Sequence, residues 1–244
     1  LINEISEQKK KNLCEKPISL SLEKLSKIKK IIQKKKIQLY EAIAYYSHPQ
    51  TNELLKLIQN DEIGEIKNIE SNLGFKTSFK PSKRIFNSTL GGGAIFDLGC
   101  YPLSFFMLFA KDHTKISINS KTLSYAPNSI DDDASAVLNY NNEFTSNIHV
   151  SFKRHLNNTC IIHGTKGFIK INEPWFPNLT SEIEVSSNRH FYLKTINSKL
   201  SVYANQIERV SESFINPGAK INLFNIEKSL INMRLISNWM DNKN

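Results

Sequence analysis

Two segments of this chain carry an amine and a phenol in patterns that could support acid–base chemistry. The first is Glu15-Lys16-Pro17, at the end of a short apolar run, and the second is the block Gly91 to Pro102, which contains Asp97 and Tyr101. Oxidation of a secondary alcohol needs a protein base that takes the hydroxyl proton while a hydride leaves for a nicotinamide ring. The reverse reaction needs the same group as an acid. A lysine and a tyrosine that lie next to one another could supply this acid/base group.

Tyr101 can act as this base only if its pKa falls. A free phenol, with a pKa of about 10, is too weak a base at neutral pH, but a neighbouring lysine ammonium favours the phenolate. Lys16 follows a predicted parallel strand, at the edge where ligands of doubly wound sheets bind. Asp97 precedes Tyr101 by one helical turn, so a continuous helix would place both side chains on one face and let the carboxylate orient the substrate or Lys16.

Each of these residues also has a structural interpretation. Lys16 could be a solvated lysine after a strand, Tyr101 a core aromatic with a satisfied hydroxyl, and Asp97 a helix cap. The glycines 91–93 are expected to serve backbone conformation and close approach, and not catalysis. His48 either lines the substrate pocket or belongs to the helix start at Pro49. Trp175 either walls that pocket or packs in the core.

Composition and charge exclude several classes of protein. The 244 residues are 40% hydrophobic, enough to bury a sizeable core. No stretch approaches the roughly 18 apolar residues of a membrane span, so no membrane partner is predicted. Much of the formal charge of +9 comes from lysines in segment 24–36, whose other side carries regularly spaced Leu and Ile. This is a solvated helix face, and without a nucleic-acid motif no nucleic-acid partner is predicted.

Cysteine and histidine positions argue against metal and disulfide chemistry. Cys14, Cys100 and Cys160 are widely spaced and odd in number, which argues against a disulfide framework and a cysteine zinc site and favours the reducing cytoplasm. The histidines show no metal-ligand spacing with Cys, Asp or Glu. No metal site is therefore predicted.

The hydrophobic pattern predicts alternating strands and helices in the first part of the chain. The expected order is the end of a helix over 1–10, a strand over 11–15, a helix capped by Ser21 over 21–36, a buried strand over 37–46, a helix over 49–60 and a strand over 64–75. The early βαβ order is typical of a parallel sheet with a crossover helix.

The later part of the chain is predicted to be mainly antiparallel sheet. After the glycine block and an apolar helix that ends near Ala110, apolar residues alternate with polar ones over 134–140 and 144–152. The segment Gly164 to Gly167 is predicted to be a hairpin turn and not a phosphate loop, because no helix start follows it. The chain closes with two helical segments, 202–215 and 223–240.

These residues, in this order, resemble the Gfo/Idh/MocA family of oxidoreductases and, within it, the dihydrodiol dehydrogenase-like branch. The resemblance covers essentially the whole chain, and its anchors are the segments 14–17, 41–50, 63–66, 91–102 and 164–169. It implies α/β followed by α+β architecture. Residues 1–46 would be the C-terminal part of a Rossmann NAD(P)-binding domain. Residues 47–244 would form a substrate and dimerisation domain with an open, mainly antiparallel sheet and helices on one face.

The resemblance implies an NAD(P)-dependent dehydrogenase of sugar metabolism that acts on the CH–OH group of a sugar-like or diol substrate. In such an enzyme Lys16 would hydrogen-bond the reacting oxygen and Tyr101 would be the acid/base group. The full set of predicted site residues is catalytic Lys16, Tyr101 and Asp97, cofactor-binding Glu15, Lys16 and Pro17, and substrate-binding His48, Asp97 and Trp175.

Three features depart from the family pattern. Many relatives carry an arginine at the position of Tyr46, so a contact made by that guanidinium is not expected here. Tyr101 stands where the inositol dehydrogenase branch has a histidine, which favours dihydrodiol or aldose-type substrates over inositol. The 244 residues contain no Gly-x-Gly-x-x-Gly loop. The choice between NAD and NADP is therefore not encoded in them. We expect an N-terminally truncated chain that alone binds neither cofactor tightly.

The sheet also predicts association. One face of an antiparallel sheet can pack on helices while the other stays exposed, and family members commonly cover that second face with a partner subunit. A homodimer through the sheet is therefore expected.

The alternative function is a noncatalytic remnant, a ligand-binding or dimerisation module without the nucleotide-binding half. A strand followed by Gly-x-Gly-x-x-Gly in the upstream reading frame would favour the enzyme.

Overall fold

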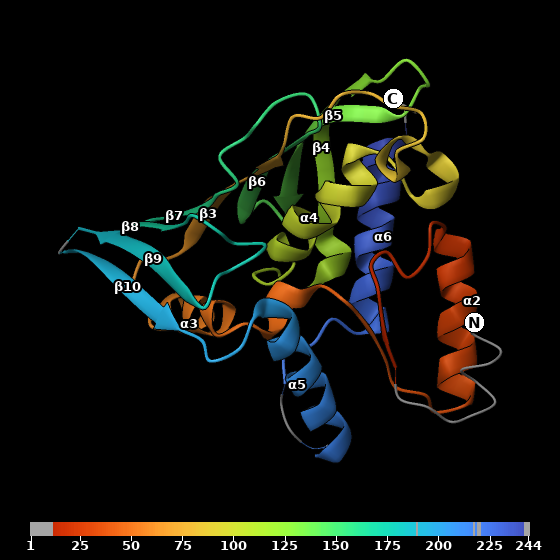
Figure 1. Ribbon diagram of the computed structural model, residues 1–244. Coiled ribbons are helices and arrows are strands. Elements are labelled where there is room, and N and C mark those ends of the chain that lie inside the picture. The colour runs from red at the N-terminus through yellow and green to blue at the C-terminus, as the bar shows by residue number, and fades with distance from the viewer. Residues whose placement is uncertain (1–11, 189, 217, 219–220, 242–244) are drawn as a thin grey trace.

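The computed structural model describes residues 12–188, 190–216, 218 and 221–241 (Figure 1). The helix predicted over 1–10 lies outside the described residues. The described chain forms a two-stranded parallel sheet and an eight-stranded sheet, with helices packed against them. None of its helices is both long and apolar enough to cross a membrane.

The small sheet has the βαβ order expected from the sequence. Strand β1 (Asn12–Cys14) pairs in parallel with β2 (Leu39–Glu41), and helix α2 (Leu22–Lys34) connects them. Ser21 caps α2, because its hydroxyl accepts a hydrogen bond from the Lys24 amide at 3.4 Å. The predicted parallel pair and the predicted cap are both confirmed.

The second strand is shorter than its apolar sequence suggests. It ends at Glu41, and Ala44–Ser47 forms a 3-10 helix, η1, where the strand was predicted to continue to Tyr46. That part of the prediction is wrong. All four residues of η1 are buried, and a short apolar run that is buried on every side has no periodicity that distinguishes a strand from a helical turn. The predicted boundary between residues 46 and 47 falls inside η1 and stays a prediction.

The eight-stranded sheet forms most of the molecule. Its spatial order is β10-β9-β8-β7-β3-β6-β5-β4. Its strands are β3 (Ile66–Gly74), β4 (Ile116–Tyr125), β5 (Asp131–Tyr140), β6 (Phe144–Ser151), β7 (Cys160–Gly164), β8 (Gly167–Ile171), β9 (Thr180–Ser187) and β10 (Phe191–Asn197). Only the β3–β6 pair is parallel among these neighbours. The predicted antiparallel sheet and the hairpin between β7 and β8 are confirmed.

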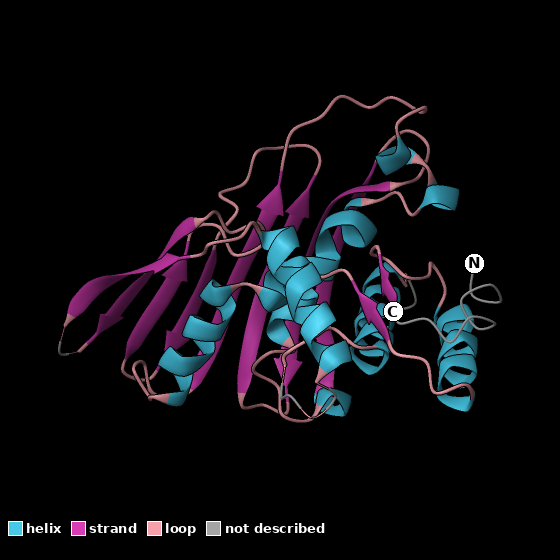
Figure 2. Ribbon diagram, turned by 60° about the horizontal axis from the view of Figure 1, so that its bottom comes forward, coloured by secondary structure: helices cyan, strands magenta, loops and turns pink. Residues whose placement is uncertain are grey.

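Helices lie on one face of this sheet (Figure 2). They are α3 (Pro49–Gln59), α4 (Cys100–Phe106) and α6 (Ile226–Met240), while α5 (Val202–Ile215) packs on η1. Along β5, buried apolar residues alternate with half-exposed polar ones such as Ser135 and Asn139. The apolar set belongs to the main hydrophobic core. The polar set therefore faces away from the helices.

A second, smaller hydrophobic cluster joins the two ends of the described chain. Leu25, Ile28 and Ile32 of α2 pack with Ile226 and Met233 of α6. Phe96, which follows the three glycines 91–93, packs against both this cluster and the main core. The small parallel sheet is thus held against the large domain by the last helix of the chain.

Candidate active site

Lys16 lies directly after β1, at the carboxyl end of the parallel pair. The Lys16–Pro17 peptide bond is cis. The segment is tied to the neighbouring strand because the Ile18 amide donates to Glu41 Oε1 at 3.2 Å. Glu41 ends β2 and is buried, and burial raises the pKa of its carboxyl group. The end of β2 therefore fixes the position of the loop that carries Lys16.

The glycine block positions Asp97 next to Lys16. Gly93 has a φ of 111°, and a Cβ at this position would lie 2.2 Å from Asp131 Oδ1. Because there is no side chain at Gly93, Asp131 can approach the backbone and accept a hydrogen bond from the Ile95 amide at 2.7 Å. Asp131 thus binds the first turn of the helical segment that carries Asp97. The predicted conformational role of the glycines is confirmed at this position.

The helical segment itself is irregular. Ile95–Gly99 forms a π-helical turn, η4, and α4 begins at Cys100. The continuous α-helix predicted between Asp97 and Tyr101 is therefore wrong in detail, because the π turn changes the spacing of side chains along the axis. Asp97 and Tyr101 nevertheless both contact Lys16.

Lys16, Asp97 and Tyr101 meet in three dimensions. Lys16 Nζ donates to the Asp97 carbonyl oxygen at 2.6 Å and lies 3.2 Å from Asp97 Oδ1, across 81 residues of sequence. The same ammonium lies 4.9 Å from the centroid of the Tyr101 ring. The side chains of Lys16 and Asp97 are only 14% and 13% exposed. Their charges therefore interact more strongly than those of a surface ion pair.

Both Lys16 and Tyr101 hold their protons firmly. Burial by itself lowers the pKa of Lys16, but the Cys100 and Asp97 side chains together outweigh it and raise that pKa. Burial also raises the pKa of Tyr101 above its usual value. The expectation that Lys16 lowers the pKa of Tyr101 is therefore wrong. The ammonium lies against the ring and donates to Asp97, and among the described residues no hydrogen bond joins it to the Tyr101 hydroxyl.

Aromatic side chains hold Tyr101 in place. Ring centroids lie 5.2 Å from Tyr101 at Phe176, 6.4 Å at Trp175 and 6.5 Å at Tyr45. Trp175 is 1% exposed, and its Nε1 donates to the Asn72 carbonyl oxygen at 3.2 Å. Phe176 is 42% exposed. Trp175 therefore packs against Tyr101 from the buried side, while Phe176 contacts the Tyr101 ring from the exposed side. Within the described chain the Tyr101 hydroxyl has no hydrogen-bond partner.

His48 has a structural role at the start of α3. Its Nδ1 accepts a hydrogen bond from the Gln50 amide at 3.2 Å, and the side chain is fully buried. Burial lowers the pKa of His48 to about 4, so the ring is neutral at pH 7. In the described residues no hydrogen bond or ion pair joins it to Lys16, Asp97 or Tyr101. Its predicted contact with substrate stays a prediction.

Sequence reasoning missed Arg84. Arg84 Nη2 donates to Asp97 Oδ1 at 2.7 Å, and the side chain is 51% exposed. Asp97 therefore pairs with two cations, Lys16 from one side and Arg84 from the other. The available signal was an arginine shortly before the glycine block, in a chain whose basic residues are mostly lysine. The pairing of Arg84 with Asp97 could not be predicted from this signal, because segment 75–94 has no periodicity that indicates where its side chains lie.

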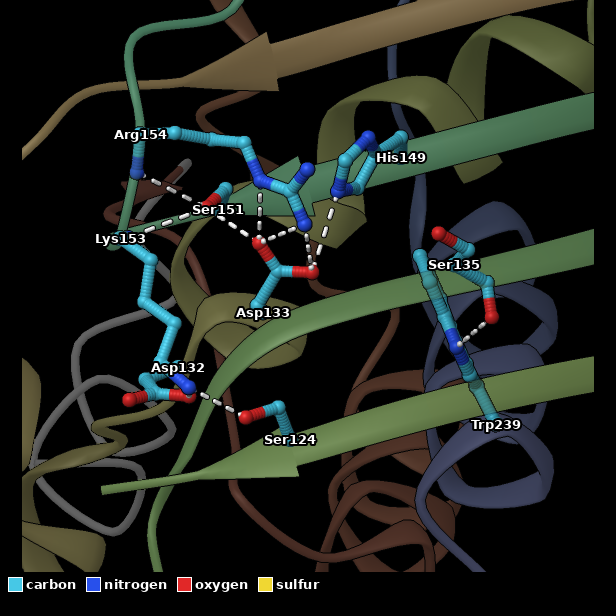
Figure 3. Close-up of polar contacts among 9 residues, drawn as sticks. All are labelled: Ser124, Asp132, Asp133, Ser135, His149, Ser151, Lys153, Arg154 and Trp239. Atoms are coloured by element: carbon cyan, nitrogen blue, oxygen red, sulfur yellow. Dashed lines mark hydrogen bonds and ion pairs between the residues drawn. The ribbon is translucent and has the colours of Figure 1, made fainter.

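A second polar cluster lies on the side of the sheet away from the helices (Figure 3). Asp133 accepts hydrogen bonds from Ser151 Oγ at 2.7 Å and from Arg154 at 3.0 and 3.1 Å, and His149 Nε2 lies 3.2 Å away. Ser151 donates to the carboxylate and not to the imidazole, so no relay for a serine nucleophile is formed. The described residues contain no group of three or more His, Cys, Asp or Glu arranged for a metal ion.

Comparison with known proteins shows a solved structure of the same fold and a family model that matches part of the chain. The chain superimposes on the 3-ketoreductase KijD10 of Actinomadura kijaniata, solved in complex with NADP and TDP-benzene, with a TM-score of 0.83 at 17% identity, over 97% of this chain and 72% of that one. The two proteins therefore share a fold. Residues 51–170 match the GFO/IDH/MocA C-terminal domain. The family resemblance is confirmed.

The relatives that match by sequence are named as dehydrogenases and oxidoreductases. The uncharacterized oxidoreductase ORF334 of Rhizobium meliloti is 29% identical over 68% of this chain and 49% of its own length. The trans-1,2-dihydrobenzene-1,2-diol dehydrogenase of Xenopus tropicalis is 29% identical over 73% and 53%. The D-xylose 1-dehydrogenase (NADP(+)) 2 of Haloferax volcanii is 25% identical over 71% and 53%. The chain thus spans about half the length of these curated relatives.

Proposed function

We propose that the protein is an NAD(P)-dependent oxidoreductase that transfers a hydride between nicotinamide and the CH–OH or carbonyl carbon of a sugar-like or diol substrate. The observation that carries the proposal is the meeting of the Lys16 ammonium, the Asp97 carboxylate and the Tyr101 ring at the carboxyl end of β1. The names of a diol dehydrogenase and a D-xylose dehydrogenase among the relatives support the substrate class.

The residues after β1 fit a nicotinamide cofactor. Glu15 is exposed, and Lys16 and Pro17 are half-buried, at the strand end where doubly wound sheets bind their ligands. We therefore assign cofactor contacts to these three residues. When bound, a nicotinamide ring supplies or accepts the hydride. The choice between NAD and NADP is left open, since these 244 residues contain no Gly-x-Gly-x-x-Gly loop.

Lys16 and Tyr101 are suited to donate protons. Both are protonated at neutral pH, so both can stabilise a substrate oxygen as it gains negative charge, and either can transfer its proton to that oxygen. Asp97 positions the ammonium and keeps it charged. In the oxidative direction one of the two groups must first lose its proton, which their raised pKa values disfavour. We therefore propose that the site is organised for proton donation to a carbonyl.

Substitution of the two donors tests this function. In the product of the complete gene, Lys16→Met and Tyr101→Phe should each lower turnover by roughly a hundredfold or more while the cofactor Kd changes little. The double variant should be little worse than the worse single one, because the two residues act on one oxygen. The measurement is single-turnover nicotinamide absorbance with dihydrodiol and aldose substrates.

Two outcomes would contradict the assignment. Near-normal turnover of Tyr101→Phe would make the phenol a core residue and leave the acid role to Lys16. No turnover by the wild type with any of these substrates, together with substrate binding, would favour the noncatalytic ligand-binding alternative. A fold control is the thermal unfolding of each variant, which should stay close to that of the wild type because Phe and Met preserve most of the buried volume.

We also propose that the protein is a homodimer through the polar face of the large sheet. This face contains an open cavity of about 540 Å³, lined by side chains of β3, β4, β5 and β6. Half-exposed Asn, Ser and Thr side chains on these strands can form hydrogen bonds across an interface. The helices cover the opposite face (Figure 2). A second copy would therefore meet the sheet without displacing any described element.

A further inference from the structure

The loop between β3 and η4 carries several cations and no carboxylate. Segment 75–94 contains no Asp or Glu, and its cations are Lys76, Lys80, Lys83 and Arg84. All of them are exposed except Lys83, which is half-buried. Within the described chain, Arg84 is the only member of this set that forms an ion pair. Its partner is Asp97, so this positive surface adjoins the Lys16 site.

A turn of the backbone brings three of these cations together. The Lys83 amide donates to the Lys80 carbonyl oxygen at 3.0 Å, which closes a β-turn with Pro81 at its second position. Proline favours this position because its ring fixes the backbone angle that the turn requires. Arg84 follows at once and begins the 3-10 helix η2 (Arg84–Phe86). We call Lys80, Lys83 and Arg84 the basic turn.

Aromatic packing fixes the basic turn to the large domain. The ring centroid of Phe86 lies 5.1 Å from that of Phe79 and 5.9 Å from that of Phe152, and Phe86 is 3% exposed. Asn128 Nδ2 donates to the Phe86 carbonyl oxygen at 2.7 Å. Because Phe79 precedes the three cations and Phe86 follows them, the backbone holds these like charges close together. A bound anion would offset their repulsion.

The charges beside Lys16 are not balanced either. Arg84 Nη2 and Lys16 Nζ contact the same oxygen, Asp97 Oδ1, at 2.7 and 3.2 Å. One carboxylate cannot neutralise two cations, so a net positive charge remains on the side of Arg84, whose side chain is 51% exposed. A guanidinium has five N–H donors, and in the described residues Arg84 uses one of them. Lys83 Nζ donates only to neutral oxygens there, the nearer being Thr77 Oγ1 at 2.6 Å.

We propose that the basic turn binds a phosphate group of the substrate, and that the substrate is therefore a phosphorylated sugar or diol. A guanidinium beside clustered ammonium groups is well suited to phosphate oxygens, because its N–H groups donate in pairs and the added charge strengthens each hydrogen bond. The contact of Arg84 with Asp97 joins the turn to Lys16, so the rest of such a substrate would lie next to the proposed proton donors. The identity of the reacting group rests on the proposed function, whereas phosphate binding does not.

The position of the basic turn favours the substrate over the cofactor as the source of the phosphate. The turn belongs to the large domain, as Asp97 and Tyr101 do. The proposed cofactor contacts instead follow β1 of the small sheet. The phosphates of NAD or NADP are therefore a different occupant, and titration in the presence of cofactor distinguishes the two.

Calorimetric titration of the product of the complete gene tests the proposal without turnover. The ligands are D-glucose, its phosphate monoester at the primary hydroxyl, and UDP-glucose, each with and without saturating NAD or NADP. At least one phosphorylated sugar should bind roughly tenfold or more tightly than glucose, and the difference should shrink as the salt concentration rises. Tighter binding of the monoester would identify a sugar phosphate, and tighter binding of UDP-glucose a diphosphate-linked sugar.

Two double variants make the test specific. Lys80→Met combined with Lys83→Met should remove most of the preference for the phosphorylated sugar, because two of the three cations are lost. Lys24→Met combined with Lys30→Met is the matched control, since it removes the same charge from exposed positions of α2 and should keep the preference.

Three results would overturn the proposal. They are equal Kd values for glucose and both phosphorylated sugars, equal effects of the two double variants, and loss of the preference when cofactor is saturating. Absence of turnover with all of these sugars would contradict the proposed function alone, because the Kd values still decide whether the basic turn binds phosphate.

Discussion

Asp97 shows how one carboxylate can set the properties of two cations. Its Oδ1 accepts from Arg84 at 2.7 Å and lies 3.2 Å from Lys16 Nζ, and its backbone carbonyl binds the same ammonium. Asp97 and Arg84 act on Lys16 in opposite senses, because Asp97 raises the pKa of Lys16 whereas Arg84 lowers it. Substitution of either neighbour should therefore change the pKa of Lys16.

Replacement of the two neighbours should shift the pH profile of activity in opposite directions. In Asp97→Asn the ammonium loses its negative partner, so the pKa of Lys16 falls and the alkaline limb of kcat/KM moves to lower pH. In Arg84→Met the pKa of Lys16 rises and the limb moves to higher pH or leaves the accessible range. The measurement is kcat/KM against pH in the carbonyl-reducing direction. Shifts of the same sign in both variants would show that Lys16 is not the titrating group.

At the scale of elements, the site depends on the contact between the glycine block and β5. Asp131, at the start of β5, is buried and binds the Ile95 amide, and burial raises the pKa of its carboxyl group. The contact requires that Gly93 has no side chain. One strand of the large sheet thereby fixes the turn that presents Asp97.

Gly93→Ala should destabilise the protein and displace Asp97. The positive φ and the clash with Asp131 Oδ1 together should cost about 1–3 kcal/mol of unfolding free energy. The matched control is Gly218→Ala, because a Cβ at Gly218 would meet no atom within 4 Å. Urea unfolding measures both. Equal stabilities of the two variants would show that Asp131 moves aside without cost, and its hydrogen bond with the Ile95 amide would then be dispensable.

Local signals made part of this architecture predictable. Helix α2 has a serine cap and an apolar stripe, and β5 and β6 alternate cleanly, so their types follow from short-range patterns. The helix η1 and the π turn at Ile95–Gly99 lack such patterns, because both are apolar segments whose shape is set by packing. The predictions for both segments were wrong for the same physical reason, because tertiary contacts override the local conformational preference there.

The candidate site was predictable to a similar extent. Motif order identified Lys16, Asp97 and Tyr101, and the structure brings these three together. The direction of the Tyr101 pKa shift was not predictable, because it depends on burial among residues far apart in sequence. The same holds for the pairing of Arg84 with Asp97. Residue type and order indicate which groups meet, whereas their exposure decides their protonation.

At the scale of the whole molecule, the helices packed on the large sheet leave its polar face without a described helix on it (Figure 2). If a second copy covers it, light scattering at micromolar concentration should give about twice the chain mass of 27.9 kDa. Asn147→Arg, at an exposed position of β6 in this face, should give the monomer, because each copy would bring an added positive charge into the interface. Ser211→Arg on α5 is the matched control and should remain dimeric. A monomeric wild type would refute the interface.

The packing of α2 on α6 also has a consequence for the order of events during synthesis. The partners that hold the small sheet come from the far end of the chain, since the Glu41 amide donates to the Phe224 carbonyl oxygen at 2.9 Å and Tyr40 bridges to Asn225. A ribosome releases residues 12–41 long before residues 224–240. Until α6 emerges, the apolar face of α2 lacks its contacts with Ile226 and Met233. Before residues 224–240 emerge, the nascent chain therefore presents a hydrophobic surface that a chaperone can bind.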